Sequence, residues 1–194
     1  EDIYRQYLKG EIKRDELYSH IPEALLSSVI NSEISDDSIE SIFGKIDSIL
    51  KKQRRKRVDF IVGGPPCQAF SMLNRHNANI ADDKRCLLYL QYGKFLKKYN
   101  PMGFVFENVL GLLSSKKNHF KNIQTHFESI GYKVHYVILN AANYGAMQNR
   151  QRVIIFGWRK TRDRGCPTIP KIDNRWTCED LFSDLPEINA GEIS

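Results

Sequence analysis

The run at positions 59–71, Asp-Phe-Ile-Val-Gly-Gly-Pro-Pro-Cys-Gln-Ala-Phe-Ser, constrains the fold of this 194-residue chain more than any other stretch. Residues 59–62 are mostly apolar and partly β-branched, which predicts a buried strand of a parallel sheet. Two glycines and two prolines then end the strand in a tight, rigid loop. Cys67 follows this loop directly. Because open α/β sheets bind ligands at the carboxyl ends of their strands, Cys67 is placed where a reactive group belongs.

A free cysteine also has a simpler interpretation, since most free cysteines are small buried hydrophobic residues. Here two stiff prolines precede Cys67 and the polar Gln68 follows it. These neighbours favour a reactive thiol over a cysteine that only fills the core.

The rest of the chain alternates between strand and helix patterns. Apolar residues at helical spacing or in short runs predict helices over 39–50, 83–99 and 120–130 and strands over 102–106, 134–139 and 153–158. This alternation predicts an α/β fold, a partial doubly wound Rossmann-like sheet with helices on both faces.

Composition narrows the class of protein. The net charge of +6 and the pI of about 9.1 favour a polyanionic partner. No apolar stretch approaches the ~20 residues that span a bilayer, and the first residues lack a signal-peptide pattern, so we expect no membrane association. The four cysteines form no C-x-x-C pair, which argues against zinc or a disulfide framework and favours the cytoplasm.

A basic run, Lys51–Arg57, holds six basic residues in seven. The run leads into the amino end of the strand at 59–62, whereas Cys67 lies beyond its carboxyl end, at least ~13 Å away at ~3.3 Å per residue. Cations also stabilise a helix C-terminus. We therefore interpret the run as a solvated helix end that makes no direct contact with the substrate.

Two more polar sites lie near strand ends. Glu107 follows the apolar strand at 102–106, and Gln148-Asn149-Arg150-Gln151-Arg152 precedes the strand at 153–158. Taken singly, Glu107 is an ordinary solvated strand end, and an Arg-rich loop is usually a surface loop with salt bridges. The presence of Cys67 at a neighbouring strand end favours a shared site.

These motifs together resemble the C5-cytosine DNA methyltransferases. The chain has G-P-P-C-Q, E-N-V and Q-x-R-x-R in the order and spacing of that family, and Asn143-Tyr144-Gly145 precedes the arginines as it does there. The resemblance covers the chain from about Glu33 to its C-terminus. It implies the sheet of an S-adenosylmethionine-dependent methyltransferase and double-stranded DNA as the substrate. It also implies a prokaryotic or phage protein of a restriction–modification system, which would work in the cytoplasm at the nucleoid.

The resemblance also implies roles for individual residues. Cys67 would attack cytosine C6 and so make C5 nucleophilic. Glu107 would share a proton with N3 in a dry site, and Arg152 with Arg150 would orient the base. Because C6 is buried in a duplex, the cytosine would be flipped out. Gln68 and Ser71 would contact DNA.

The cofactor site departs from the family pattern. No two glycines are separated by one residue, so the Gly-rich turn after the first strand is missing. The remaining candidates for S-adenosylmethionine contacts are Pro66, Leu88 and Glu33. We expect residues 1–159 to form a catalytic methyltransferase domain that lacks this turn. Residues 160–194 should form an irregular segment of the kind that precedes a target-recognition domain, which is itself absent. The chain would then be an excised segment of a longer enzyme, a split subunit or a degenerate gene product. It would be inactive until a second chain or the missing segments complete it.

Three alternatives stay open at the level of sequence. The chain is also compatible with a non-catalytic DNA-binding remnant of such an enzyme or with a tRNA cytosine methyltransferase. A Cys–His hydrolase that uses Cys67 is disfavoured, because no histidine lies in a recognisable base-orienting pattern.

Overall fold

The computed structural model describes residues 2–66, 88–114, 118–172 and 176–185. The predicted nucleophile Cys67 and the predicted DNA contacts Gln68 and Ser71 lie outside these residues. The chain divides into two compact units, Glu1–Val58 and Asp59–Ser194.

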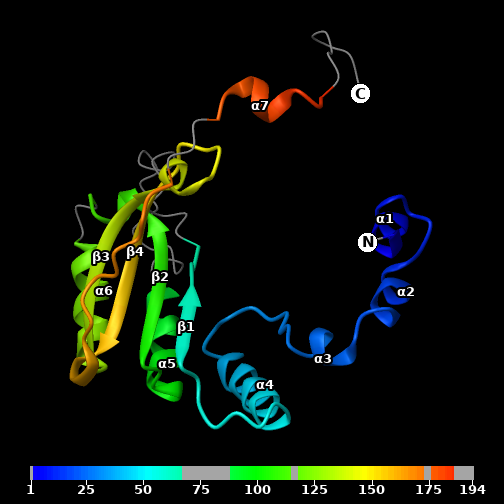
Figure 1. The fold of residues 1–194 in the computed structure, drawn as a ribbon. Helices are drawn as coiled ribbons and strands as arrows, with labels where there is room; N and C mark the ends of the chain where they lie inside the picture. Colours follow the sequence, from blue (N-terminus) through cyan, green and yellow to red (C-terminus); the bar gives the residue numbers. More distant parts are fainter. Residues whose placement is uncertain (1, 67–87, 115–117, 173–175, 186–194) are drawn as a thin grey trace, which may run out of the picture. The chain divides into compact units, whose positions relative to one another are not determined.

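The first unit is helical (Figure 1). Helices α1 (Asp2–Leu8), α2 (Arg14–Ser19) and α3 (Glu23–Leu26) are short and contain no buried residue. Helix α4 (Ile39–Lys52) confirms the helix that the sequence predicts, and its apolar stripe buries Ile39, Ile42 and Phe43. A stripe at this spacing gives an amphipathic helix one face to bury.

The second unit contains a four-stranded sheet in the order β1-β2-β4-β3 (Figure 1). Its strands are β1 (Phe60–Gly63), β2 (Gly103–Val109), β3 (Tyr132–Asn140) and β4 (Gln151–Arg159). Strand β1 is parallel to β2, as predicted, and β4 is antiparallel to both of its neighbours. The connection from β3 to β4 holds only the short 3-10 helix η6 (Ala141–Tyr144), and so short a connection joins antiparallel strands. The partial Rossmann-like α/β fold is confirmed, with a mixed sheet.

Helices α5 (Leu88–Tyr99) and α6 (His119–Ser129) cover the same face of this sheet. Aromatic side chains fill the core between them: the rings of Phe104 and Phe127 are 4.9 Å apart, and that of Tyr92 is 5.8 Å from each. Such tilted and edge-on contacts add to the free energy gained from burying the rings. The sequence predicts helices on both faces, and within this unit α5 and α6 share one.

Two strands differ in detail from the sequence-based expectation. Strand β2 continues past Phe106 to Val109, so Glu107 lies inside the strand, because β4 pairs with it as far as Arg152. In β1, Phe60 and Val62 are 42% and 75% exposed, although the sequence predicts a buried strand. The side chain of Ile61 faces the helices, and alternation along the strand turns its two neighbours to the opposite face.

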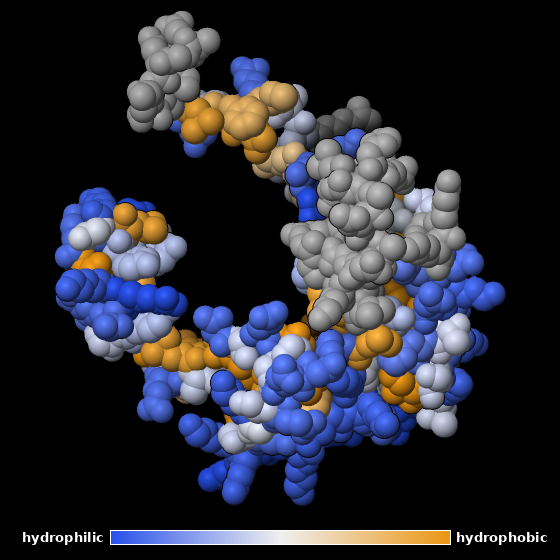
Figure 2. Space-filling view, turned by 180° about the vertical axis from the view of Figure 1, so that it is seen from behind, coloured by the Kyte–Doolittle hydropathy of each residue, from blue (hydrophilic) through white to orange (hydrophobic). Residues whose placement is uncertain are grey.

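Beyond β4, the predicted irregular segment contains the 3-10 helix η7 (Lys160–Arg162) and the helix α7 (Cys178–Phe182). A capping box between Thr177 and Asp180 starts α7. Trp176, Phe182 and Leu185 are at least 50% exposed, so apolar side chains of this segment lie on the surface, where Figure 2 shows hydrophobic residues in orange. None of the helices in the described part of the chain has the length and hydropathy to cross a membrane.

Candidate active site

An ion pair between Glu107 and Arg152 lies at the centre of the candidate site. Nε of Arg152 is 2.8 Å from Oε1 of Glu107, and the two side chains are 22% and 42% exposed. Both residues point away from the core, because they alternate with the buried Phe106, Asn108 and Val153. The structure therefore brings together two of the residues that the sequence predicts for the site.

The strand register explains this contact. Glu107 pairs with Ile154 and Arg152 pairs with Val109, so the two charged residues are diagonal neighbours on one face of an antiparallel pair. Diagonal neighbours lie ~7–8 Å apart at the backbone, which long side chains can bridge.

Gly64 places the Gly-Gly-Pro-Pro loop beside this pair. In the parallel register Gly63 is opposite Phe106, which puts Gly64 next to Glu107. A Cβ atom on Gly64 would lie 2.7 Å from Oε2 of Glu107, closer than real Cβ contacts. Glycine therefore permits the approach of the loop, which continues through Pro65 and Pro66 towards Cys67.

Gly63 lies close to a side chain on the opposite face of the same strand. A Cβ atom there would lie 3.0 Å from the ring of Tyr92. The hydroxyl group of Tyr92 lies 3.0 Å from the carbonyl oxygens of both Ile61 and Val105, so it can donate a hydrogen bond to either. Burial raises the pKa of Tyr92, which keeps this donor protonated. Tyr92 thus links β1 to β2 behind the site.

Arg150 belongs to the loop between β3 and β4, and Asn140 fixes that loop. Oδ1 of Asn140 accepts hydrogen bonds from the backbone N–H groups of Ala142 (3.2 Å) and Arg150 (3.1 Å). Its Nδ2 donates to Oδ1 of Asn149 at 2.7 Å, and the backbone N–H of Ala141 donates to the carbonyl of Arg150 at 3.0 Å. The side chain of Arg150 is exposed, and no contact joins it to Glu107 within the described residues.

Three residues beside the site were missed by the sequence-based prediction of functional positions. Asn108 is 3% exposed, and its Oδ1 accepts a hydrogen bond from the N–H of Val109 at 2.8 Å. Tyr92 and Asn140 are the other two. A polar residue inside an apolar strand signals Asn108, but Tyr92 resembles any core residue of an amphipathic helix. Asn140 looks like any polar residue at the end of a strand.

The predicted cofactor contacts lie in both units. Pro66 is exposed and lies two residues after Gly64, and Leu88 is the half-buried first residue of α5. Because α5 runs back from the carboxyl end of β1 to the start of β2, both lie at the end of the sheet that carries Gly64. Glu33 belongs to the first unit and is exposed.

A carboxylate and a guanidinium group side by side can bind a planar heterocycle. The carboxylate accepts from ring N–H groups, and the rigid donor fork of arginine binds carbonyl or phosphate oxygens. A thiol carried by the adjoining loop would add a nucleophile to this pair.

The comparison with protein families gives a match over residues 31–189 to the model described as C-5 cytosine-specific DNA methylase. The chain is 41% identical over 144 residues to the Type II methyltransferase M.DdeI of Desulfomicrobium norvegicum, which covers 70% of this chain and 34% of that protein. It is 36% identical over 151 residues to M1.HphI of Haemophilus parahaemolyticus, covering 76% and 40%. The chain thus spans less than half the length of these relatives.

Solved structures show a similar fold. A prophage-encoded DNA modification methyltransferase from E. coli superposes with a TM-score of 0.57 and 26% identity, over 84% of this chain and 41% of that one. The Entamoeba histolytica methyltransferase EhMeth gives a TM-score of 0.54 at 18% identity, over 76% and 42%, and supports the fold alone.

Proposed function

Because the chain belongs to the C-5 cytosine-specific DNA methylase family, we propose that it forms the catalytic segment of an enzyme that methylates C5 of cytosine in DNA. The observation that carries this proposal is the Glu107–Arg152 ion pair beside Gly64, three residues before Cys67. Double-stranded DNA is the proposed substrate, with the target cytosine flipped out of the helix. Such an enzyme would work in the bacterial cytoplasm, at the nucleoid.

Each charged residue has a proposed task. The Cys67 thiolate forms a bond to C6, and C5 then reacts as an enamine carbon. Glu107 holds a proton at N3 and so neutralises the charge that builds up on the ring. Arg152 holds the Glu107 carboxylate and the O2 oxygen, and Arg150 binds the adjoining phosphate. A base stacked in this site would displace water from Glu107, which is 42% exposed without it.

The proposed methyl donor is S-adenosylmethionine, which supplies an electrophilic methyl group when bound. Pro66 and Leu88 offer apolar contacts at the correct end of the sheet. Glu33 remains a predicted polar contact of the cofactor. The Gly-rich turn and the target-recognition part would come from further segments or a second chain.

The test is a chimera in which residues 31–189 of this chain replace the matching segment of M.DdeI. The chimera should methylate DNA and should form a covalent complex with 5-fluorocytosine DNA that survives a denaturing gel, because fluorine blocks release of the cysteine. Cys67→Ser should abolish the complex, since a serine hydroxyl is hardly ionised at neutral pH. Calorimetric binding of the cofactor by both chimeras would show that each is folded. Trapping that persists in Cys67→Ser would reject the nucleophile, and a folded, cofactor-binding chimera without methyl transfer would reject the proposal.

A further inference from the structure

The end of α4 and the residues after it form a basic surface, defined as Lys51, Lys52, Arg54, Arg55, Lys56 and Arg57. All six are exposed. Without them the chain has 23 basic and 23 acidic residues, so this one surface accounts for the entire net charge of +6. A charge concentrated in this way creates a local field that attracts polyanions.

Three cations of the basic surface lack an acidic partner among the described residues. Within the described part of the chain, no acidic side chain forms a salt bridge with Lys52, Arg54 or Arg55. Solvated cations of this kind keep their counterions and can exchange them for phosphate groups.

The backbone conformation of Arg54 distinguishes this surface from an ordinary helix end. Arg54 has φ = 54°, in the left-handed region. Its N–H donates to the carbonyl of Lys51 (3.0 Å), and the N–H of Arg55 donates to that of Leu50 (2.8 Å). These bonds define a Schellman motif, in which the left-handed position is usually glycine.

Arginine is a costly choice at that position. A side chain in the left-handed conformation is strained, and glycine would avoid the strain. Lys51 and Lys52 already supply the last turn of α4 with the cations that favour a helix C-terminus. The helix end alone therefore does not explain the third cation, Arg54, which indicates that its charge has a use outside the helix.

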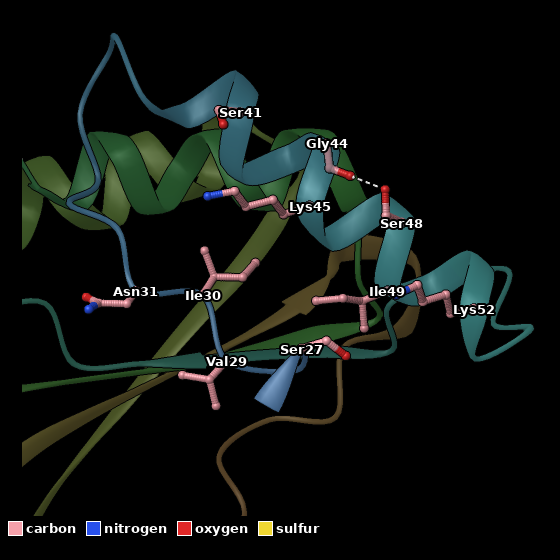
Figure 3. Close-up of a pocket in the computed structure, with 10 residues that line it drawn as sticks. All are labelled: Ser27, Val29, Ile30, Asn31, Ser41, Gly44, Lys45, Ser48, Ile49 and Lys52. Carbon is pink, nitrogen blue, oxygen red and sulfur yellow. Dashed lines mark hydrogen bonds between the residues drawn. The ribbon is translucent and has the colours of Figure 1, made fainter. Parts of the chain in front are cut away.

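Helix α4 has a further cation, Lys45, which lines a cavity in the first unit. An open cavity of about 500 Å³ lies between α4 and the extended segment that contains Val29 and Ile30. Figure 3 shows Lys45 and Lys52 from α4 among its lining residues. Since they are seven residues apart, they lie on one face of the helix and extend the basic surface along it.

We propose that the basic surface binds the phosphate backbone of duplex DNA without reading its bases. The run at 51–57 contains no aromatic or aliphatic residue, so it offers neither stacking for single strands nor an apolar face for a membrane. The inference rests on the proposed function only in taking DNA as the polyanion. Its role would be to add sequence-independent affinity for DNA to the chain that acts on cytosine.

The test measures binding of the 194-residue chain to a duplex made only of A·T pairs, by fluorescence anisotropy at several salt concentrations. Each lost phosphate contact should reduce the slope of log K against log salt by about 0.9. Arg54→Gly should reduce the slope by roughly that amount, while it raises Tm by roughly 2–4 °C through relief of the strain. Arg55→Gln and Lys52→Gln should reduce the slope further.

Two controls separate charge from backbone effects. Lys97→Gln removes a cation from the last turn of α5 and should leave the slope unchanged. Asn100→Gly relieves another left-handed residue, with φ = 45°, and should not weaken binding. An unchanged slope in Arg54→Gly would reject the surface, and so would an equal loss in Lys97→Gln. A loss seen only with duplex RNA would reject DNA as the partner. Because the probe has no cytosine, either result is independent of the methyl-transfer assay.

Discussion

Gly64 lies so close to Glu107 that a Cβ atom at position 64 would be 2.7 Å from the Oε2 atom of that carboxylate. The Cβ and Cδ atoms of Glu107 would be 3.6 and 3.7 Å away, at ordinary contact distance. Among the described residues, the carboxylate oxygen is the atom that obstructs a side chain at this position. The position of the loop at Gly64 and the ion pair between Glu107 and Arg152 therefore both depend on the orientation of the Glu107 carboxylate.

This relationship predicts an unequal effect of Gly64→Ala on stability and activity. Rotation of the carboxylate would relieve the contact at a cost of less than about 1 kcal/mol, so the urea midpoint should change little. The same rotation would pull Oε1 away from Arg152, so methyl transfer by the chimera should fall by roughly tenfold or more.

Gly44→Ala is the matched control. Gly44 lies inside α4, and a Cβ atom there would meet nothing within 4 Å. Alanine should stabilise the helix by about 1 kcal/mol and leave methyl transfer unchanged. If Gly64→Ala were as active as the wild type, Glu107 would not need the position that Gly64 gives it.

Asn140 provides a second prediction, because it closes the loop that carries Arg150. Asn140→Ala would remove the acceptor for two backbone N–H groups and the bond to Asn149, at a cost of about 1 kcal/mol in unfolding free energy. Methyl transfer should fall more than this suggests, because the loop that positions Arg150 would be free to move. Asn149→Ala removes one of these bonds and should have a smaller effect in both assays. Equal effects of the two changes on activity would contradict this role for Asn140.

The sequence could predict the elements and one half of the site. Helical spacing from Ile39 to Leu50 and the apolar runs at 102–106 and 153–158 are local signals, and α4, β2 and β4 confirm them. The motifs at Glu107 and Arg152 flank neighbouring strands, so pairing of these strands brings the side chains into contact. The roles of Cys67, Gln68 and Ser71 remain predictions.

Other features depend on contacts that no local pattern encodes. The antiparallel entry of β4 between β2 and β3 is a matter of strand order, and it extends β2 through Glu107. The exposure of Val62 depends on which face the helices cover. The left-handed Arg54 could not be foreseen, because the sequence at that position argues for any conformation but that one.

The third prediction concerns the hydroxyl group of Tyr92, whose removal should lower the free energy of unfolding without changing the charge of the protein. Tyr92→Phe would remove the buried hydroxyl that bonds to the carbonyls of Ile61 and Val105, at a cost of about 1–2 kcal/mol measured by urea unfolding. Tyr89→Phe is the control on the same helix, since no hydrogen bond of its hydroxyl occurs among the described residues. It should cost less than about 0.5 kcal/mol. A similar loss in both variants would show that the ring, and not the hydroxyl, links β1 to β2.

Asp163 gives the last prediction, which concerns pH. The backbone N–H of Gly165 (3.0 Å), Nζ of Lys133 (3.0 Å) and Nε2 of His135 (2.7 Å) contact its carboxylate, and they hold the pKa of Asp163 well below its usual range. A depressed pKa in the folded state means that the stabilisation is complete above the unfolded value of about 3.9 and is lost as the pH falls below it.

The measurement compares Tm of the wild type and of Asp163→Asn across pH. The difference should shrink steadily as the pH falls through 4 and below, because the wild-type carboxylate then takes up a proton and loses its bond to Lys133. Lys133→Gln should reproduce part of the neutral-pH loss and weaken the pH dependence, since one of the contacts that lower the pKa is gone. A Tm difference that grows on acidification would have the opposite sign and would show that the folded state favours the protonated acid.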